Sequence, residues 1–296
     1  MKLVSVYLIT HNRSELLKRA INSILEQDYP AIELIVVDDA STDNTSEIIN
    51  ALRQHHDFIY LRNEVASGAC FSRNRAIEVA SGYYVTGLDD DDYFCSSRVT
   101  QLVAAYDEKY AFVCANVFEL MGSGELINRN FGFQAGEFGL DKLLHHNLVG
   151  NQVLTTRSKF KAIGGFDINM PAFQDYDTWV RLLRQTPLAL KIPARNYVLE
   201  TEHGGMRISS SNGRKIEGYE FFISKNKDIL SKQQLKSMQV MKYKISGEKF
   251  SLFNLLCYIH KYNYKSVIHL YVIRNFPWIK ITIDRFKKYS SRGAAQ

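Results

Sequence analysis

The sequence has few cysteines and no long apolar run, and both shortages narrow the class of protein. Its 296 residues include only Cys70, Cys95, Cys114 and Cys257, without the paired spacings of zinc sites. No stretch reaches the roughly eighteen uninterrupted apolar residues of a membrane-spanning helix. The first residues also lack the pattern of a secretory signal. We therefore expect a cytoplasmic protein with reduced thiols that does not cross a membrane by itself.

Several nucleotide-binding and synthase signatures are missing as well. No GxGxxG follows the first apolar run, which argues against a dehydrogenase. The first turn, residues 10–13, reads Thr-His-Asn-Arg and lacks the Gly-rich phosphate loop with which a nucleotidyltransferase normally opens. A membrane-embedded processive polysaccharide synthase would need spanning helices and a QxxRW-like motif, and the sequence shows neither. These absences argue against such a synthase.

Acidic residues are scarce at the C-terminal end. Residues 241–296 hold 11 Lys and Arg but only 2 Asp and Glu, a net charge of +9. The remaining residues hold 26 basic and 29 acidic side chains, so the overall charge of +6 comes from the tail. An anionic partner for the tail is therefore expected, and a nucleic-acid-binding core is not. No nucleic-acid-binding motif accompanies the charge.

What is present in the first half is an alternation of strand and helix patterns. Short apolar runs with β-branched residues alternate with stripes of helical period, and this order predicts a parallel sheet with right-handed crossovers. In such sheets ligands collect at the carboxyl ends of the strands. The predicted strands are residues 3–9, 32–37, 58–61 and 83–88, and the predicted helices are residues 14–27, 44–53 and 69–80.

The second half is less regular. Residues 122–139 are Gly-rich and read as a loop, followed by a strand near residues 152–156 and helices near Lys159 and Asp175. After about residue 205 the sequence becomes helical and polar, and the last segment is aromatic and basic. We predict a first, larger domain over residues 1–210, with halves 1–95 and 96–210, and a helical extension over residues 211–296.

The most specific motif is a run of four aspartates, residues 89–92, at the end of an apolar strand. Adjacent carboxylates repel one another, and a divalent cation offsets that cost. Oxygen ligands suit Mg²⁺ or Mn²⁺ equally. The alternative is a solvated acidic turn, but the position at the ligand-binding rim of a parallel sheet favours a metal site.

Three further motifs each allow a functional and a structural interpretation. Asp39, at the end of the second strand, can accept from a nucleobase N–H or form a turn. Arg73, in a helix opened by Gly68, can contact phosphate or lie on the surface. Asp175 can be a general base on an acceptor hydroxyl or an N-cap of its helix. An isolated histidine, His203, becomes a candidate metal or diphosphate ligand only beside a carboxylate-bound metal.

In this order and spacing the motifs resemble glycosyltransferase family 2, inverting enzymes with the GT-A fold. The resemblance covers roughly residues 3–210. It implies that residues 1–210 form a GT-A nucleotide-sugar transferase domain, with residues 1–95 as the nucleotide-binding half and residues 96–210 as the acceptor half. At residues 174–175 the family usually has Glu-Asp, and this sequence has Gln-Asp. The motifs that carry the resemblance are residues 4–6 with 10–13, 37–41, 68–74, 89–92, 164–167 and 174–177.

The resemblance implies a role for each candidate residue. Asp39 would contact the base, which the family's habit suggests is uracil, and Asp89 would contact the ribose. Asp91 would hold the metal on the diphosphate with Asp92 nearby, Asp175 would be the catalytic base, and His203 would assist at the metal or diphosphate. The nucleotide-sugar-binding residues would be Thr10, Asn12, Arg13, Asp39, Arg73, Asp89 and Asp90, and the metal ligands Asp91, Asp92 and His203.

The expected reaction is transfer of a hexose, of glucose or galactose type, from a UDP-sugar to a polyprenyl-diphosphate-linked or growing saccharide. Such chemistry serves bacterial surface polysaccharides such as O-antigen. Aromatic residues interleave with Lys and Arg over residues 249–292, and a basic segment with tryptophan can lie in the membrane interface. We therefore expect peripheral contact with the inner face of the cytoplasmic membrane; packing of these helices on the catalytic domain is the alternative. A nucleotidyltransferase, or a non-catalytic sugar-nucleotide-binding protein, is the alternative for the whole chain.

Overall fold

The computed structural model describes residues 1–150, 152–200 and 212–279, which form two compact units. Unit 1 contains the described residues of 1–143 and 147–200, and unit 2 contains residues 144–146 and 212–279. The predicted boundary at residues 210 and 211 lies outside the described residues. That boundary therefore stays a prediction, and so does the division of the first domain at residue 95.

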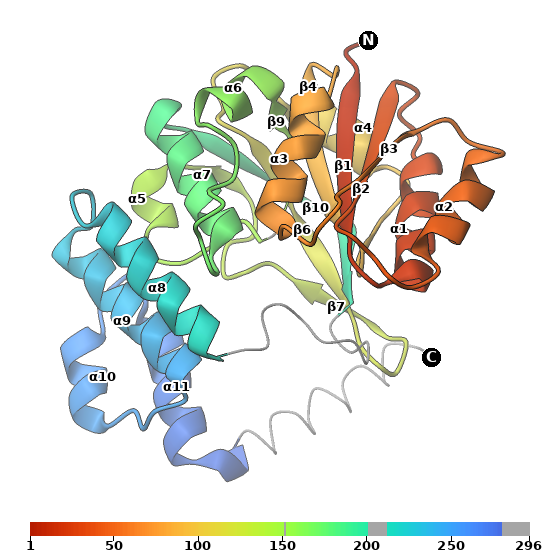
Figure 1. Cartoon of the computed structure of the whole chain (residues 1–296). Helices are drawn as coiled ribbons and strands as arrows, with labels where there is room; N and C mark the ends of the chain where they lie inside the picture. Colours follow the sequence, from red (N-terminus) through yellow and green to blue (C-terminus); the bar gives the residue numbers. More distant parts are fainter. Residues whose placement is uncertain (151, 201–211, 280–296) are drawn as a thin grey trace, which may run out of the picture. The chain divides into compact units, whose positions relative to one another are not determined.

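The first sheet of unit 1 has the parallel strands that the sequence predicts. The strand order is β3-β2-β1-β4-β9, with β1, β2, β3 and β4 parallel and the short β9 antiparallel at the edge (Figure 1). Because β1 connects to β2 on one side and β4 lies on its other side, the strand order reverses between β1 and β4. The bounds are β1 Val4–Thr10, β2 Ile32–Asp38, β3 Ile59–Arg62, β4 Tyr84–Asp89 and β9 Thr155–Thr156.

Three helices connect these strands, as predicted. They are α1 (Ser14–Leu25), α2 (Thr45–Arg53) and α3 (Ala69–Val79). α1 buries a stripe at helical spacing that includes Leu17, Ile21 and Ile24. This stripe joins the core of unit 1 with the fully buried apolar side chains of β1. Burial on both faces explains why the strands read as continuous apolar runs.

A second, mixed sheet completes unit 1, and the sequence predicts only part of it. Its order is β5-β10-β6-β7, with β8 also paired to β10. The loop expected over residues 122–139 is wrong, because β7 and β8 lie within it and pair antiparallel with β6 and β10. The bounds are β5 Tyr93–Phe94, β6 Val113–Leu120, β7 Leu126–Arg129, β8 Gly136–Phe138 and β10 Ala189–Glu200.

Four more helices belong to unit 1: α4 (Arg98–Ala105), α5 (Leu140–Leu143), α6 (Arg157–Ala162) and α7 (Gln174–Gln185). The helices expected near residues 159 and 175 are α6 and α7. The N-cap of α7 is Phe173, in the left-handed conformation with φ 65°. Asp175 is therefore inside the first turn of α7, and its interpretation as the N-cap is wrong.

Unit 2 is helical in its described part, as the sequence predicts for the region after residue 211. Its small core is made by Val240, Phe250, Val267 and Leu270. Ser231 and Gln234 form a capping box at the start of α9. α11 ends at residue 275, two residues before Pro277. The helices are α8 (Asn212–Asn226), α9 (Lys232–Ser246), α10 (Leu252–Tyr258) and α11 (Tyr264–Asn275).

The segment 144–146 belongs to unit 2 through a histidine contact. His145 Nδ1 lies 2.9 Å from Ser237 Oγ, which lies 3.0 Å from His260 Nε2. The ring of His145 also stacks on Tyr262, with 4.6 Å between centroids. In the described parts of the chain no helix is both long and apolar enough to span a bilayer.

Candidate active site

The candidate residues gather where β1, β2 and β4 end at their carboxyl termini. β1 and β4 are neighbours in the first sheet, and the strand order reverses between them. This is the position at which open α/β sheets bind ligands. Thr10 ends β1, Asp38 ends β2 and Asp89 ends β4, so motifs up to 80 residues apart meet at one edge.

Asp90 is buried and fully engaged by the turn after β1. Thr10 Oγ1 donates to Asp90 Oδ2 at 2.9 Å, and Arg13 Nη1 donates to Asp90 Oδ1 at 2.9 Å. The same guanidinium nitrogen donates to Asp91 Oδ2 at 3.1 Å. Burial raises the pKa of Asp90 to about 6, although Arg13 opposes the rise. Arg13 thus neutralises part of the charge that four adjacent aspartates create.

Asp92 is directed at the second sheet. Tyr197 donates its hydroxyl to Asp92 Oδ2 at 2.7 Å, and the Glu200 backbone N–H donates to Oδ1 at 3.0 Å. Burial, followed by the charges of Asp91 and Asp89, raises the pKa of Asp92 well above its ordinary value. Asp92 therefore joins β4 to the end of β10, and both of its oxygens already accept a hydrogen bond.

Asp89 and Asp91 are the more accessible members of the acidic run. Their side chains are 24% and 15% exposed, against 8% for Asp90. Within residues 1–150, 152–200 and 212–279, no three His, Cys, Asp or Glu side chains form a group able to hold a metal ion. His203, the third predicted ligand, lies outside the described residues.

Arg73 joins the acidic run to Asp175. Its Nη2 donates to Asp89 Oδ1 at 2.8 Å, and its Nη1 lies 3.6 Å from Asp175 Oδ1. Asp175 Oδ1 is buried and has no hydrogen-bond partner in the described part of the chain. Burial raises the pKa of Asp175 to about 7, with Arg73 opposing the rise and Asp89 adding to it. A carboxyl group with this pKa can exchange a proton near neutral pH.

Asp39 organises the loop that leads into α3. Its Oδ1 accepts from Asn63 Nδ2 at 2.6 Å, Ser67 N at 2.8 Å and Ser72 Oγ at 3.1 Å. Among the described residues, its Oδ2 accepts from Gly68 N alone, at 2.8 Å. Burial by itself would raise the pKa of Asp39, but these hydrogen bonds outweigh it and leave the pKa below its ordinary value. Because a carboxylate oxygen has two lone pairs, Oδ2 can accept one more donor.

Two asparagines connect the remaining motifs. Asn12, at φ 54°, accepts from the backbone N–H of Thr42 at 2.7 Å, so the turn after β1 is tied to the turn after β2. Asn74 of α3 exchanges two hydrogen bonds of 2.8 Å with the backbone of Phe166. A side chain at Gly165 would collide with Asn74, which explains the glycine there. Residues 164–167 are thereby placed against the helix that carries Arg73.

Sequence comparison decides the family. The profile described as Glycosyl transferase family 2 matches residues 5–164, more than half of the chain. This chain belongs to glycosyl transferase family 2. Among its relatives is the putative colanic acid biosynthesis glycosyl transferase WcaA of Escherichia coli K12, 33% identical over 86% of this chain and 92% of that protein. Another is the Escherichia coli UDP-Glc:alpha-D-GlcNAc-diphosphoundecaprenol beta-1,3-glucosyltransferase WfaP, 34% identical over 73% of this chain and 82% of that protein.

Comparison of structures agrees on the fold. The crystal structure of residues 1–349 of S. aureus TarS in complex with UDP-GlcNAc matches with a TM-score of 0.68 and 19% identity. The match covers 92% of this chain and 81% of that one. The fold is therefore the GT-A fold, with a mostly parallel sheet flanked by helices and a C-terminal helical region, as predicted. The chain is thus a family 2 glycosyltransferase, and the relatives named above act in bacterial polysaccharide biosynthesis.

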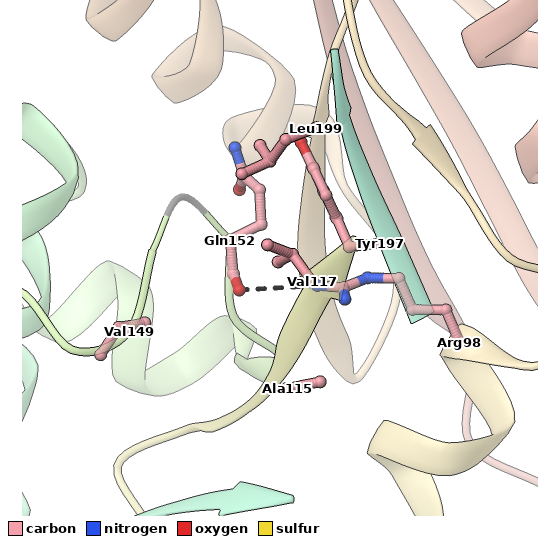
Figure 2. A pocket seen from close by; sticks show the side chains of 7 residues that line it. All are labelled: Arg98, Ala115, Val117, Val149, Gln152, Tyr197 and Leu199. Carbon is pink, nitrogen blue, oxygen red and sulfur yellow. Dashed lines mark hydrogen bonds between the residues drawn. The ribbon is translucent and has the colours of Figure 1, made fainter. Parts of the chain in front are cut away.

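The structure also reveals buried polar residues behind the acidic run that the sequence analysis missed. Arg98, Gln152 and Tyr197 line a cavity of about 10 Å³ together with apolar side chains, which leaves room for about one water molecule. Figure 2 shows the side chains that line it. Arg98 is buried, donates to Asn196 Oδ1 at 2.8 Å and lies over the ring of Tyr197. Burial lowers the pKa of Arg98 to about 10. No local sequence pattern marks these residues, because their partners are 50 to 100 positions away.

Proposed function

We propose that this family 2 enzyme transfers a hexose, of glucose or galactose type, from a UDP-sugar to a lipid-diphosphate-linked or growing saccharide, with inversion at the anomeric carbon. The relative WfaP is named for UDP-glucose as donor and for a diphosphoundecaprenol-linked sugar as acceptor. The observation that supports the proposal is the Arg73 bridge, in which one guanidinium contacts both Asp175 and Asp89 at the carboxyl end of β4.

The donor nucleotide would lie along the carboxyl ends of β1, β2 and β4. Asp39 would receive the base N–H on Oδ2, the oxygen that accepts one hydrogen bond from the part of the chain that the structure describes. Asp89, at the end of β4, would contact the ribose. The other nucleotide-sugar-binding residues of the proposal, Thr10, Asn12, Arg13, Arg73 and Asp90, shape this rim and balance its charge.

The acidic run fits a divalent ion that is shared with the substrate. Mg²⁺ is commonly held by one or two carboxylates together with substrate phosphates and water, so a complete protein cage is not required. Asp91 would be the main ligand, with Asp92 beside it and His203 as a further ligand. Mg²⁺ or Mn²⁺ bound there would neutralise charge on the diphosphate leaving group.

Asp175 would act as the general base. A sugar hydroxyl is a poor nucleophile until a base begins to remove its proton, and direct attack on the anomeric carbon inverts its configuration. The raised pKa of Asp175 makes its carboxylate basic enough to take that proton near neutral pH. Arg73 would keep enough of the group ionised for it to do so.

Unit 2 would hold the enzyme at the inner face of the cytoplasmic membrane, where a lipid-linked acceptor is found. Residues 249–279 contain four Lys and Arg and no Asp or Glu. The side chains of Leu252, Phe253, Leu256 and Trp278 are 56%, 73%, 65% and 65% exposed. Anionic lipids attract such a basic surface, and apolar side chains of this kind insert at the headgroup level.

A panel of nucleotide sugars tests the proposal. Each donor is incubated with a synthetic lipid-diphosphate-sugar acceptor, with Mn²⁺ or with a chelator, and release of the nucleoside diphosphate is measured. We expect UDP release from a UDP-hexose that depends on metal and rises with acceptor. Release of pyrophosphate from a nucleoside triphosphate would instead identify a nucleotidyltransferase. Binding of a nucleotide sugar without turnover on any acceptor would favour a non-catalytic protein.

A further inference from the structure

Gln152, a residue outside the motifs, lies in direct contact with Asp89. Its side chain is buried, with 4% of the residue exposed. Its Nε2 donates to Asp89 Oδ1 at 3.2 Å, and its Oε1 accepts from the Tyr7 hydroxyl at 3.0 Å. Gln152 therefore bridges β1, which carries Tyr7, and the end of β4.

The Tyr7 hydroxyl decides which way the Gln152 amide faces. Burial holds the pKa of Tyr7 far above its ordinary value, so the phenol keeps its proton and donates it. A donating phenol requires the amide oxygen of Gln152 opposite it, and the NH₂ group then faces Asp89. If the amide were reversed, its oxygen would face the Asp89 carboxylate and its NH₂ would face a phenol proton.

Gly87 provides the space for this arrangement. A Cβ at Gly87 would lie 2.2 Å from the Tyr7 ring and 2.4 Å from Gln152 Oε1, both far inside van der Waals contact. Any other residue at this position of β4 would displace the tyrosine, the glutamine or both. The glycine, the phenol and the amide thus form one buried assembly behind Asp89.

We propose that Gln152, oriented by Tyr7, is a positioning residue that fixes the Asp89 carboxylate for donor binding. This inference rests on the proposed function, in which Asp89 contacts the ribose of the donor. Asp89 Oδ1 receives two donors, Arg73 Nη2 at 2.8 Å and Gln152 Nε2 at 3.2 Å. Two donors from different directions restrict rotation of the carboxylate before the donor arrives, and a preorganised contact costs less to form.

Steady-state kinetics with the full-length enzyme test the proposal. A ribose contact is made equally in the ground state and the transition state, so its loss raises KM and leaves kcat largely unchanged. We expect Gln152→Leu to raise the donor KM about tenfold with kcat within about threefold, and Tyr7→Phe to raise KM about threefold. Gln152→Glu, assayed near pH 8.5, should raise KM by about a hundredfold, because a carboxylate would then face Asp89.

The order of the two Gln152 variants separates positioning from packing. Glutamate has nearly the shape of glutamine, so a packing role predicts that Gln152→Glu is milder than Gln152→Leu. That order, or a fall in kcat at unchanged KM, would overturn the inference. A wild-type enzyme that releases no UDP from any donor would instead refute the proposed function, and this inference with it.

Thr155→Val is the matched control. Thr155 is fully buried on β9, three residues from Gln152, and its hydroxyl donates to the Ala111 carbonyl at 2.6 Å. Its loss should lower Tm and leave the donor KM unchanged. If Thr155→Val raised KM as much as Gln152→Leu, KM would be reporting general damage to the fold, and the positioning role would be wrong.

Discussion

The edge of the first sheet and the outer surface of α10 differ in the kind of side chain that they gather: one is charged and the other is apolar. At the sheet edge four consecutive aspartates are held close together, and arginines from the β1 turn and from α3 contact three of them. α10 has no charged residue at all, and its outer positions Leu252, Phe253 and Leu256 are more than half exposed. One region holds charges that the fold must balance, and the other exposes apolar surface that the unit does not cover.

This difference indicates how each region is completed. Burying a charge is costly unless it is paired, so the chain itself supplies partners for the acidic run, and in the proposed function a metal ion and a diphosphate complete the balance. Exposed large apolar side chains that gather on one element mark a surface for a partner. The inner positions of α10, Leu255 and Tyr258, already pack on the core of unit 2, so the helix is apolar on both sides. We expect changes at the sheet edge to alter chemistry and changes on α10 to alter location only.

The largest expected effect is at Asp175. Asp175→Asn should lower kcat by about a thousandfold, since general base catalysis contributes roughly 10²–10⁴-fold. Binding of UDP, measured by calorimetry, should stay within about threefold. Asp177→Asn is the control on the same helix turn: Asp177 pairs with Arg181 at 2.7 Å and should affect stability more than turnover. Near-normal turnover by Asp175→Asn would rule out its role as the base.

Asp91 should show the next largest effect. Asp91→Asn removes the main proposed metal ligand, and we expect kcat/KM to fall at least about a hundredfold, with metal-dependent UDP binding lost. Asp28→Asn is the control, because Asp28 is exposed and, among the described residues, its side chain accepts from Thr100 at 2.6 Å. Equal, metal-dependent UDP affinity in Asp91→Asn and the wild type would show that the ion is held elsewhere.

The α10 surface should affect location and leave chemistry unchanged. We expect Phe253→Glu with Leu256→Glu to reduce binding to vesicles containing anionic lipid about tenfold, because two exposed apolar groups that would insert into the bilayer are lost and two negative charges are added. Turnover on a water-soluble acceptor should not change. Phe221→Glu, a change on α8 at a residue 37% exposed, is the control. Vesicle binding by the double variant at the wild-type level would show that α10 is not the membrane surface.

The smallest effect expected is a pH-dependent change in stability. The pKa of Asp175 is about 7 in the folded chain and close to 3.8 when unfolded, so the unfolded state loses this proton first as pH rises. Ionisation of Asp175 therefore destabilises the fold progressively from about pH 4 to about pH 7. Asp175→Asn should raise Tm by a few degrees above pH 7, and the gain should disappear near pH 4. A gain that did not vary with pH would contradict the raised pKa.

The sequence predicts the first sheet and its site well, because both depend on local patterns. β1 to β4 are short apolar runs. Thr10, Asp39 and Asp89 lie at or directly after the ends of β1, β2 and β4, so the ends of the predicted strands also locate these candidates. The predicted residues Thr10, Arg13, Asp90 and Asp91 do lie together, as do Arg73, Asp89 and Asp175. Their roles with substrate stay predictions.

The second sheet was not predictable in the same way. β10 contains Pro193, and its inward-facing Lys191 is completely buried. Lys191 is tolerated because its ammonium group donates to the carbonyls of Asn130 and Leu148, at 3.0 and 2.8 Å. Because a buried lysine interrupts the apolar residues of β10, and its partners are distant carbonyls, the local sequence does not show the pattern of a buried strand. Gln152 was missed for the same reason, since its partners lie 145 and 63 residues away.

Calorimetric titration of UDP into the enzyme tests the central claim most directly, namely that the acidic end of β4 binds a nucleoside diphosphate together with a divalent ion. The titration is run with Mn²⁺, with Mg²⁺ and with a chelator. The account predicts binding of UDP with either ion and at least about tenfold weaker binding with the chelator. Equal affinity under all three conditions, or no binding under any of them, would contradict it.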